Sequence, residues 1–390
     1  MENRRLAGIA LLVLSAFTGT IAFRLATPAI AFYTRDVLRA SMLAVSLVSM
    51  SFVLARALTS VLGGLALERR KWLVYLGAVA MMGNALAVQL YPLTSSWIQV
   101  AGIKLLNGFL NGLSWPMAQF VVAVTTPKEI RARVTAVYFF FGSIASLLGN
   151  YAYAYTVNLG LAGQMWISSA FFVLTGLIML LSYYLLYNRI TPRSEGKSGV
   201  ISLDPGKVLI IASLMAVIVA FTSGEITYVY VAETLELSRE RTAVLLGWTG
   251  FTASLLSYFS SWFADVRSEA KTVKLTAFLA GISPLLTSIK TAPTVFLGVF
   301  LALFAFQSFR PISRKVLASY HRSSLAIGGV NAIQNLSTFV GGMIFGLAYS
   351  LGEVHIWLSL NLALLAFLPF SVGLFVEGMK IGKDIPPKLL

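Results

Sequence analysis

Long apolar runs, separated by short polar breaks, make up almost the whole chain. The runs are continuous rather than alternating, which indicates helices rather than the strands of a membrane barrel. Each run is long enough to cross a hydrocarbon layer of about 30 Å at about 1.5 Å of rise per residue. The pattern predicts twelve membrane-spanning helices, at residues 6–31, 41–67, 72–91, 97–124, 131–158, 164–188, 207–232, 242–264, 272–290, 293–319, 323–351 and 354–378.

The longest polar break, residues 188–207, is rich in glycine, proline, serine and charge, which is typical of a linker. Because it follows the sixth run, it predicts an N-terminal six-helix bundle at 1–188, a cytoplasmic linker at 189–206 and a C-terminal six-helix bundle at 207–390. The motif AFTG near the start of the first half and AFTSG near the start of the second suggest that the bundles are pseudo-symmetric copies of one unit.

Composition places the chain in a membrane. Hydrophobic residues make up 57% of it and charged residues 12%, with a mean hydropathy of +0.81, whereas a soluble domain carries about a quarter charged residues. The first run is too long for the apolar core of a secretory signal and shows no cleavage pattern before Arg24, so we expect it to be retained. The sequence therefore predicts an all-α, multi-pass integral membrane protein.

The basic residues orient the predicted helices. With both termini placed in the cytoplasm, most of the 30 Lys and Arg residues fall in cytoplasmic segments. Only Arg35, Arg39, Arg239, Arg241 and Lys290 fall in external loops, which is the positive-inside pattern. We expect the formal charge of +15 to face anionic lipid of the plasma membrane rather than nucleic acid.

The residue types present exclude several classes of function. The chain has no cysteine, and its two histidines, His321 and His355, fall in predicted loops, so we expect no metal site. No glycine-rich loop ends in Lys-Ser or Lys-Thr, which argues against ATP as a driving force. An enzyme would need paired histidines or carboxylates at membrane depth, and a receptor would bring a soluble domain. The apolar runs contain no such pairs and the loops are too short for such a domain. We therefore expect the protein to be neither an enzyme nor a receptor, and to bind no cofactor.

The break between the second and third runs carries a motif. Gly64, Glu68 and Arg69 follow the order glycine, acid, base, and Asp265 and Arg267 stand in the same relation in the second half. With its two six-helix halves, the chain resembles the major facilitator superfamily of secondary transporters over essentially its whole length. The resemblance implies that family's fold, alternating access to a central site, and a conformational latch made by these five residues. Alternatively, they contribute only positive-inside charge.

The resemblance also implies that the first, fourth, seventh and tenth spans line the central site. These spans hold four intramembrane charges that we take as candidates, namely Arg24, Lys104, Glu225 and Arg310. A charge at a helix centre costs about 2.5–3.5 kcal/mol on insertion scales, so it usually faces a cavity or a partner. Polar stripes at helical spacing either line an aqueous site or bond helices together; they include Lys104, Asn107 and Asn111 in the fourth span and Asn331 and Asn335 in the eleventh.

Arg24 and Glu225 lie at similar depth in their spans. Either they form a salt bridge that closes the external side, or Arg24 binds an anionic substrate group while Glu225 carries a proton. A carboxyl group that moves between a desolvated site and the neighbourhood of a cation can release and rebind a proton. Arg56, in the second span, either pairs with a group of the other half or reaches the central site.

Three bases against one acid make the lining spans net positive, which favours an anion. Arginine binds carboxylate or phosphate through its planar fork, and lysine acts as a point charge. The sequence predicts a monomeric secondary active transporter of a small organic anion, driven by a proton or a substrate gradient. Its candidate substrate-binding residues are Arg24, Lys104, Asn107, Asn111, Arg310, Asn331 and Asn335. The alternative is a proton-driven exporter of cationic or lipophilic drugs, which the 26 Phe, 15 Tyr and 7 Trp would suit.

Overall fold

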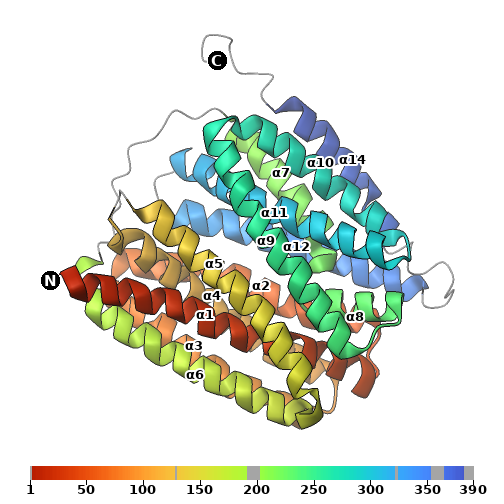
Figure 1. The fold of residues 1–390 in the computed structure, drawn as a ribbon, viewed down its shortest axis with the longest axis horizontal. Coiled ribbons are helices and arrows are strands. Elements are labelled where there is room, and N and C mark those ends of the chain that lie inside the picture. The colour runs from red at the N-terminus through yellow and green to blue at the C-terminus, as the bar shows by residue number, and fades with distance from the viewer. Residues whose placement is uncertain (1, 128–129, 191–202, 321–323, 353–363, 382–390) are drawn as a thin grey trace. The chain divides into compact units, whose positions relative to one another are not determined.

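Helices joined by short turns form the described part of the chain (Figure 1). The computed structural model describes residues 2–127, 130–190, 203–320, 324–352 and 364–381, and no strand occurs within these ranges. Helices satisfy their backbone hydrogen bonds within one segment, as a hydrocarbon surround requires. The prediction of an all-α fold is confirmed.

The helices follow the predicted runs to within a few residues at most ends. The first half contains α1 (Glu2–Phe32), α2 (Met42–Arg69), α3 (Val74–Val88), α4 (Trp97–Thr125), α5 (Arg131–Thr156) and α6 (Gly160–Leu186). The second half contains α7 (Pro205–Ile218), α8 (Gly224–Leu235), α9 (Arg239–Val266), α10 (Glu269–Ser288), α11 (Ala292–Tyr320), α12 (Ser324–Gly352) and α14 (Leu368–Lys380). Most of the predicted linker and the start of the predicted twelfth span lie outside the described residues.

Length and composition agree with a membrane protein. Seven helical stretches of the described chain are long and apolar enough to cross a membrane, and one of them, Val137–Arg189, runs through most of α5 and all of α6. Polar residues in the breaks between the apolar runs cap the N-termini of the helices that follow. Ser96 caps α4 by accepting from the Gln99 N–H, and Ser268 caps α10 in the same way from Lys271. A side-chain oxygen at this position satisfies an N–H that the helix leaves open.

The seventh predicted span is a broken helix and not the continuous segment that the apolar pattern predicts. Helix α7 ends at Ile218, a 3-10 turn follows (Val219–Thr222, η6), and α8 begins only at Gly224. Between them Ser223 is extended and Gly224 has a φ of +51°, in the left-handed region that glycine adopts readily. The polar Thr-Ser-Gly sequence therefore interrupts the apolar run and leaves Glu225 in the first turn of α8.

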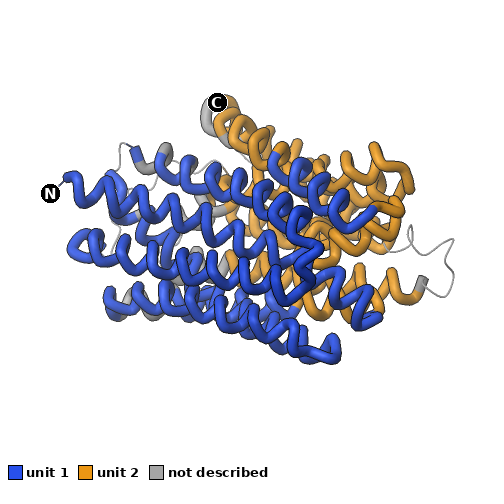
Figure 2. The backbone as a smooth tube through the Cα atoms, turned by 60° about the horizontal axis from the view of Figure 1, so that its bottom comes forward, with its two compact units in different colours: residues 1–40, 51–195, 238–251 blue, residues 41–50, 196–237, 252–390 orange. Residues whose placement is uncertain are grey.

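The structure forms two compact units whose borders cut through α2 and α9 (Figure 2). Unit 1 comprises residues 1–40, 51–195 and 238–251, and unit 2 comprises residues 41–50, 196–237 and 252–390. The start of α2 thus belongs to unit 2, and the start of α9 to unit 1. The bundle borders predicted from the linker stay a prediction.

Unit 1 is packed around α1 and α6. Helix α1 lies along α5 and α6, and α3 lies along α4 and α6. Hydroxyl groups of α6 donate to α1, with Ser168 bonded to the Ala22 carbonyl at 3.0 Å and Ser182 to the Gly8 carbonyl at 2.8 Å. Helix α4 approaches α2 through a glycine, because a Cβ at Gly108 would overlap the Phe52 backbone. Small residues at such contacts let membrane helices pack closely.

Unit 2 is packed around α7, which contacts α11, α12 and α14, while α10 lies along α11 and α14. Helix α12 also approaches its neighbours closely through glycines. A Cβ at Gly341 would overlap the Val217 carbonyl beside the break, and one at Gly342 would meet Met50 of α2. The start of α2 is thereby held against α12 and close to the broken helix.

The glycine contact of α4 generates a matched test. We expect Gly108→Ala to destabilise the protein by about 1–3 kcal/mol. The added methyl group would clash with backbone atoms of Phe52, which cannot move aside as a side chain does by changing its rotamer. Gly102→Ala, on the same helix, adds a methyl where nothing lies within 4 Å, and we expect it to be neutral or slightly stabilising. Thermal unfolding of the two variants in detergent measures the difference. Equal melting temperatures would contradict the close α2–α4 contact.

Candidate functional site

Two cations in unit 1 share one aromatic ring. The Arg56 guanidinium carbon lies 5.4 Å from the centroid of the Phe52 ring, and the Lys104 ammonium lies 5.5 Å from the same centroid. Phe23 of α1 packs edge-on against Phe52, with 6.1 Å between centroids. Lys104 is buried, at 8% exposed. Lys104 of the fourth span and Arg56 of the second span, for which the sequence left two roles open, therefore belong to one cluster. We call it the Phe52 cluster (Phe52, Arg56, Lys104).

The Phe52 cluster concentrates positive charge. A cation over a ring face gains about 0.5–1 kcal/mol when exposed and about 2 kcal/mol or more when desolvated. The two charges lie at most about 11 Å apart, so at an effective dielectric of about 20 they repel each other by at least about 1.5 kcal/mol. A negative charge close to both groups would offset this repulsion.

Asn107 and Asn111, the other predicted residues of this stripe, are buried, each at 3% exposed. Asn107 is the centre of a hydrogen-bonded chain in which the Tyr91 hydroxyl donates to its Oδ1 at 2.5 Å. Its Nδ2 donates to Asn84 Oδ1 at 3.0 Å, and Asn84 in turn donates to the Ala80 carbonyl. These bonds favour, for Asn107, the alternative that it joins helices α3 and α4.

The Arg24 side chain on α1 is exposed. Its Cβ lies against Gly149 of α5, which has no side chain and so lets the two helices approach closely. The neighbouring Thr27 bonds back to the Phe23 carbonyl of its own helix at 2.7 Å. Arg24 belongs to unit 1 and Glu225 to unit 2. Their predicted pairing stays a prediction.

Glu225 in unit 2 is held by a residue that the sequence did not single out, Ser49 of α2. The Ser49 hydroxyl lies 2.6 Å from Glu225 Oε2 and accepts from the Glu225 backbone N–H at 3.0 Å. Glu225 is 1% exposed and Ser49 2%. Ser46 and Ser49 stand three residues apart on one helix face, but serine is common in apolar helices, so this spacing alone did not mark Ser49.

Unit 2 also holds buried donors on α11 and α12. The Arg310 guanidinium lies over the ring of Phe306, at 5.5 Å from the centroid. Its Nε is buried and has no hydrogen-bond partner among the described residues, and the same holds for Nε2 of Gln334. Asn331 and Asn335 are half-buried on α12, whereas Gln334, which the sequence reading missed, is 4% exposed. Gln334 lies three residues after Asn331, at the helical spacing of the polar stripe on α12. This spacing is the sequence signal by which it could have been identified.

Little of the predicted latch can be placed. Helix α2 runs through Gly64 and Glu68 to Arg69, and Asp265 lies in the last turn of α9. The side chains of these four residues lie outside the description, and Arg267 is exposed just beyond α9. The latch stays a prediction.

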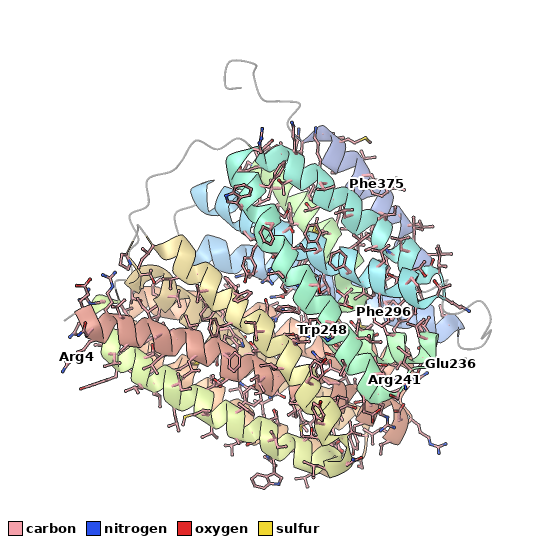
Figure 3. The ribbon with its side chains drawn as sticks, viewed as in Figure 1. Arg4, Glu236, Arg241, Trp248, Phe296 and Phe375 are labelled. Carbon is pink, nitrogen blue, oxygen red and sulfur yellow. The ribbon has the colours of Figure 1, made fainter. Side chains whose placement is uncertain are left out.

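Side-chain contacts join the start of α9 to the rest of unit 1. Arg239 forms a salt bridge of 2.7 Å with Asp36, which follows α1, but both side chains are more than a third exposed. An exposed pair contributes at most about 1 kcal/mol. Further along α9 lies Trp248, which is labelled in Figure 3. It donates to the Tyr151 hydroxyl of α5 at 3.0 Å. Within the described ranges no group of three or more acids or histidines could hold a metal ion.

Comparison with known proteins extends these observations. A model of the Major Facilitator Superfamily matches residues 12–224, and no curated protein matches the chain. A solved structure of a variant of the nucleoside transporter NupG superposes with a TM-score of 0.74 at 12% identity, covering 95% of this chain and 99% of that one. The human organic anion transporter MFSD10 (TETRAN) superposes with a TM-score of 0.66 at 15% identity, covering 96% and 99%.

A bacterial homolog of the human lysosomal transporter Spinster adds a third structure with the same fold, with a TM-score of 0.68 at 13% identity and 95% of each chain covered. At these identities the likeness shows the fold alone. The family model itself matches more than half of the chain. This protein, an integral membrane transporter and not an enzyme, therefore belongs to the major facilitator superfamily.

Proposed function

We propose that this transporter moves a small organic anion across the plasma membrane by alternating access, with Glu225 as the group that takes up and releases a coupled proton. The observation that carries the anion proposal is the Phe52 cluster, where a buried lysine and an arginine share one ring. A carboxylate or phosphate that bound between them would offset their repulsion and form charge-assisted hydrogen bonds, which are about twice as strong as neutral ones.

Unit 2 offers donors to the same class of substrate. A buried donor without a partner costs about 1–3 kcal/mol, so Arg310 Nε and Gln334 Nε2 would each gain by binding a substrate oxygen. In this proposal Arg24, Arg310, Asn331 and Asn335 complete the substrate site, together with Asn111. Asn107 supports the site by fixing α4 against α3.

The remaining parts follow the family's architecture. Two bundles, 1–188 and 207–390, would rock about the substrate site, with both termini in the cytoplasm and the protein acting as a monomer. Gly64, Glu68, Arg69, Asp265 and Arg267 would latch the cytoplasmic helix ends. Arg24 and Glu225 would then pair when the external side closes, so the gate and the proton roles of Glu225 are two phases of one cycle.

Removal of either cation of the Phe52 cluster tests the anion site. In proteoliposomes we expect counterflow of benzoate, succinate or glycerol 3-phosphate, and we expect Lys104→Gln and Arg56→Gln each to lower it about tenfold or more. The loss of a charge-assisted bond, about 1.5–3 kcal/mol, sets this magnitude. Lys274→Gln removes an exposed lysine of α10 and serves as the control. Transport of ethidium with no anion counterflow would refute the proposal and favour drug export.

Neutralisation of Glu225 tests the proton role. We expect Glu225→Gln to abolish net transport driven by an imposed pH gradient, because a glutamine cannot exchange a proton, and to lower counterflow far less. Glu236→Gln, at the exposed end of the same helix, is the control. Net transport is measured with a pH-sensitive dye inside the vesicles. Undiminished pH-driven transport in Glu225→Gln would remove the proton role.

A further inference from the structure

The contact between Ser49 and the broken helix is more specific than a helix–helix hydrogen bond. One hydroxyl oxygen lies within reach of three groups of a three-residue stretch. It is 2.6 Å from Glu225 Oε2, 3.0 Å from the Glu225 nitrogen and 3.4 Å from the Ser223 carbonyl oxygen. All of these residues belong to unit 2.

The backbone is shaped to admit this hydroxyl. Gly224 has a φ of +51°, and a Cβ on it would overlap Ser49 Oγ. A side chain at position 224 would therefore both strain the backbone and expel the serine. The break before α8 leaves N–H groups of its first turn open, which is why Glu225 N–H can bond a side chain of α2.

A serine hydroxyl donates one hydrogen bond and accepts up to two. When Glu225 is a carboxylate, Ser49 donates to Oε2 and accepts from the Glu225 N–H. When Glu225 is protonated on Oε2, the new O–H donates to Ser49 Oγ, and the serine hydrogen turns to the Ser223 carbonyl, which already lies within 3.4 Å. No heavy atom has to move, and the hydroxyl is satisfied in both states.

We propose that Ser49 is a positioning residue for the proton-carrying carboxyl group of Glu225, whose hydroxyl reverses its hydrogen bonds as the proton binds and leaves. The proposal rests on the proposed proton role of Glu225. In the step, one O–H bond forms on Oε2 as a proton arrives from water, and the Ser49 hydrogen only rotates. The α2–α8 contact thus survives protonation, and the carboxyl group stays aimed in one direction through the cycle.

The ionisable groups on the described elements of unit 2 near this contact can be named. The stretch 42–50 of α2 and the turn η6 carry none. Helix α8 itself carries Tyr228, Tyr230 and Glu233; Tyr230 donates to the Thr287 carbonyl, and Glu233 accepts from Tyr349 of α12. Helix α11 carries Arg310, and Lys207 lies in the first turn of α7, at the end of that helix away from the break.

Infrared difference spectra of the full-length protein in detergent, recorded between acidic and alkaline pH, test the proposal without a substrate. The carbonyl band of protonated Glu225 is the band that Glu225→Gln removes. We expect Ser49→Ala and Ser49→Val to move it to higher frequency, as for a carboxyl group with fewer hydrogen bonds. We expect Ser49→Thr, which keeps the hydroxyl and has the shape of valine, to leave it in place.

Ser46→Ala is the matched control, because Ser46 lies one turn earlier on α2, is fully buried, and its hydroxyl has no hydrogen-bond partner among the described residues. We expect it to leave the band in place. A Glu225 band that stays in place in Ser49→Ala and Ser49→Val overturns the role of Ser49 and leaves the proton role of Glu225 standing. If Glu225→Gln removes no band at any pH, the proton role of Glu225 itself is overturned.

The pH profile of net transport gives a second readout. The bond from Ser49 to the charged carboxylate is stronger than its bond to the neutral acid, so alanine weakens the two states unequally. We expect the profile of Ser49→Ala to be displaced along the pH axis relative to Ser46→Ala, and that of Ser49→Thr to be kept. A bracing role alone would lower transport by one factor at every pH, and that result would contradict the proposal.

Discussion

A backbone group inside a hydrocarbon layer must find its hydrogen-bond partner within the protein, and this requirement governs the break in the seventh predicted span. The chain leaves helical geometry between Ile218 and Gly224. Side-chain hydroxyls take over part of the bonding that the helix gives up. Thr227 donates to the Phe221 carbonyl, and Ser49 serves the Glu225 N–H. The break is therefore tolerated where α2 can reach it, and the position of Glu225 follows from that contact.

Close helix approach is the second condition, and glycine supplies it on both parts of α2. In unit 1 the part of α2 after residue 51 meets Gly108 of α4, and in unit 2 its start meets Gly342 and Gly346 of α12. Contacts this close fix the neighbours of the α2 residues that make them, which are Phe52 in unit 1 and Met50 and Ser46 in unit 2. Ser49 is fixed by a different glycine, because a Cβ at Gly224 would overlap its hydroxyl.

The sequence predicted the helices well and the site only in outline, for a physical reason. Apolar length and flanking charge are local properties, so the helix ends and the membrane class follow from them. The partner of a side chain depends on tertiary contacts that no single segment contains. Lys104 was recognised because a charge in an apolar segment is energetically costly. The ring that it contacts, Phe52, could not be distinguished in the sequence from the other apolar residues. Asn107 was recognised for the same reason and was assigned to substrate, although Tyr91 and Asn84 occupy its amide.

The proposed coupling of the anion to a proton has an electrostatic reason. Moving one elementary charge against a membrane potential of 100 mV costs about 2.3 kcal/mol. A monovalent anion that crosses together with one proton carries no net charge with it, so the potential does not oppose the pair. Unit 1 supplies the cations of the Phe52 cluster and unit 2 the carboxyl group of Glu225. The proposed coupling requires that protonation of Glu225 and anion binding favour each other, because the effect of one ligand on the affinity for a second is reciprocal.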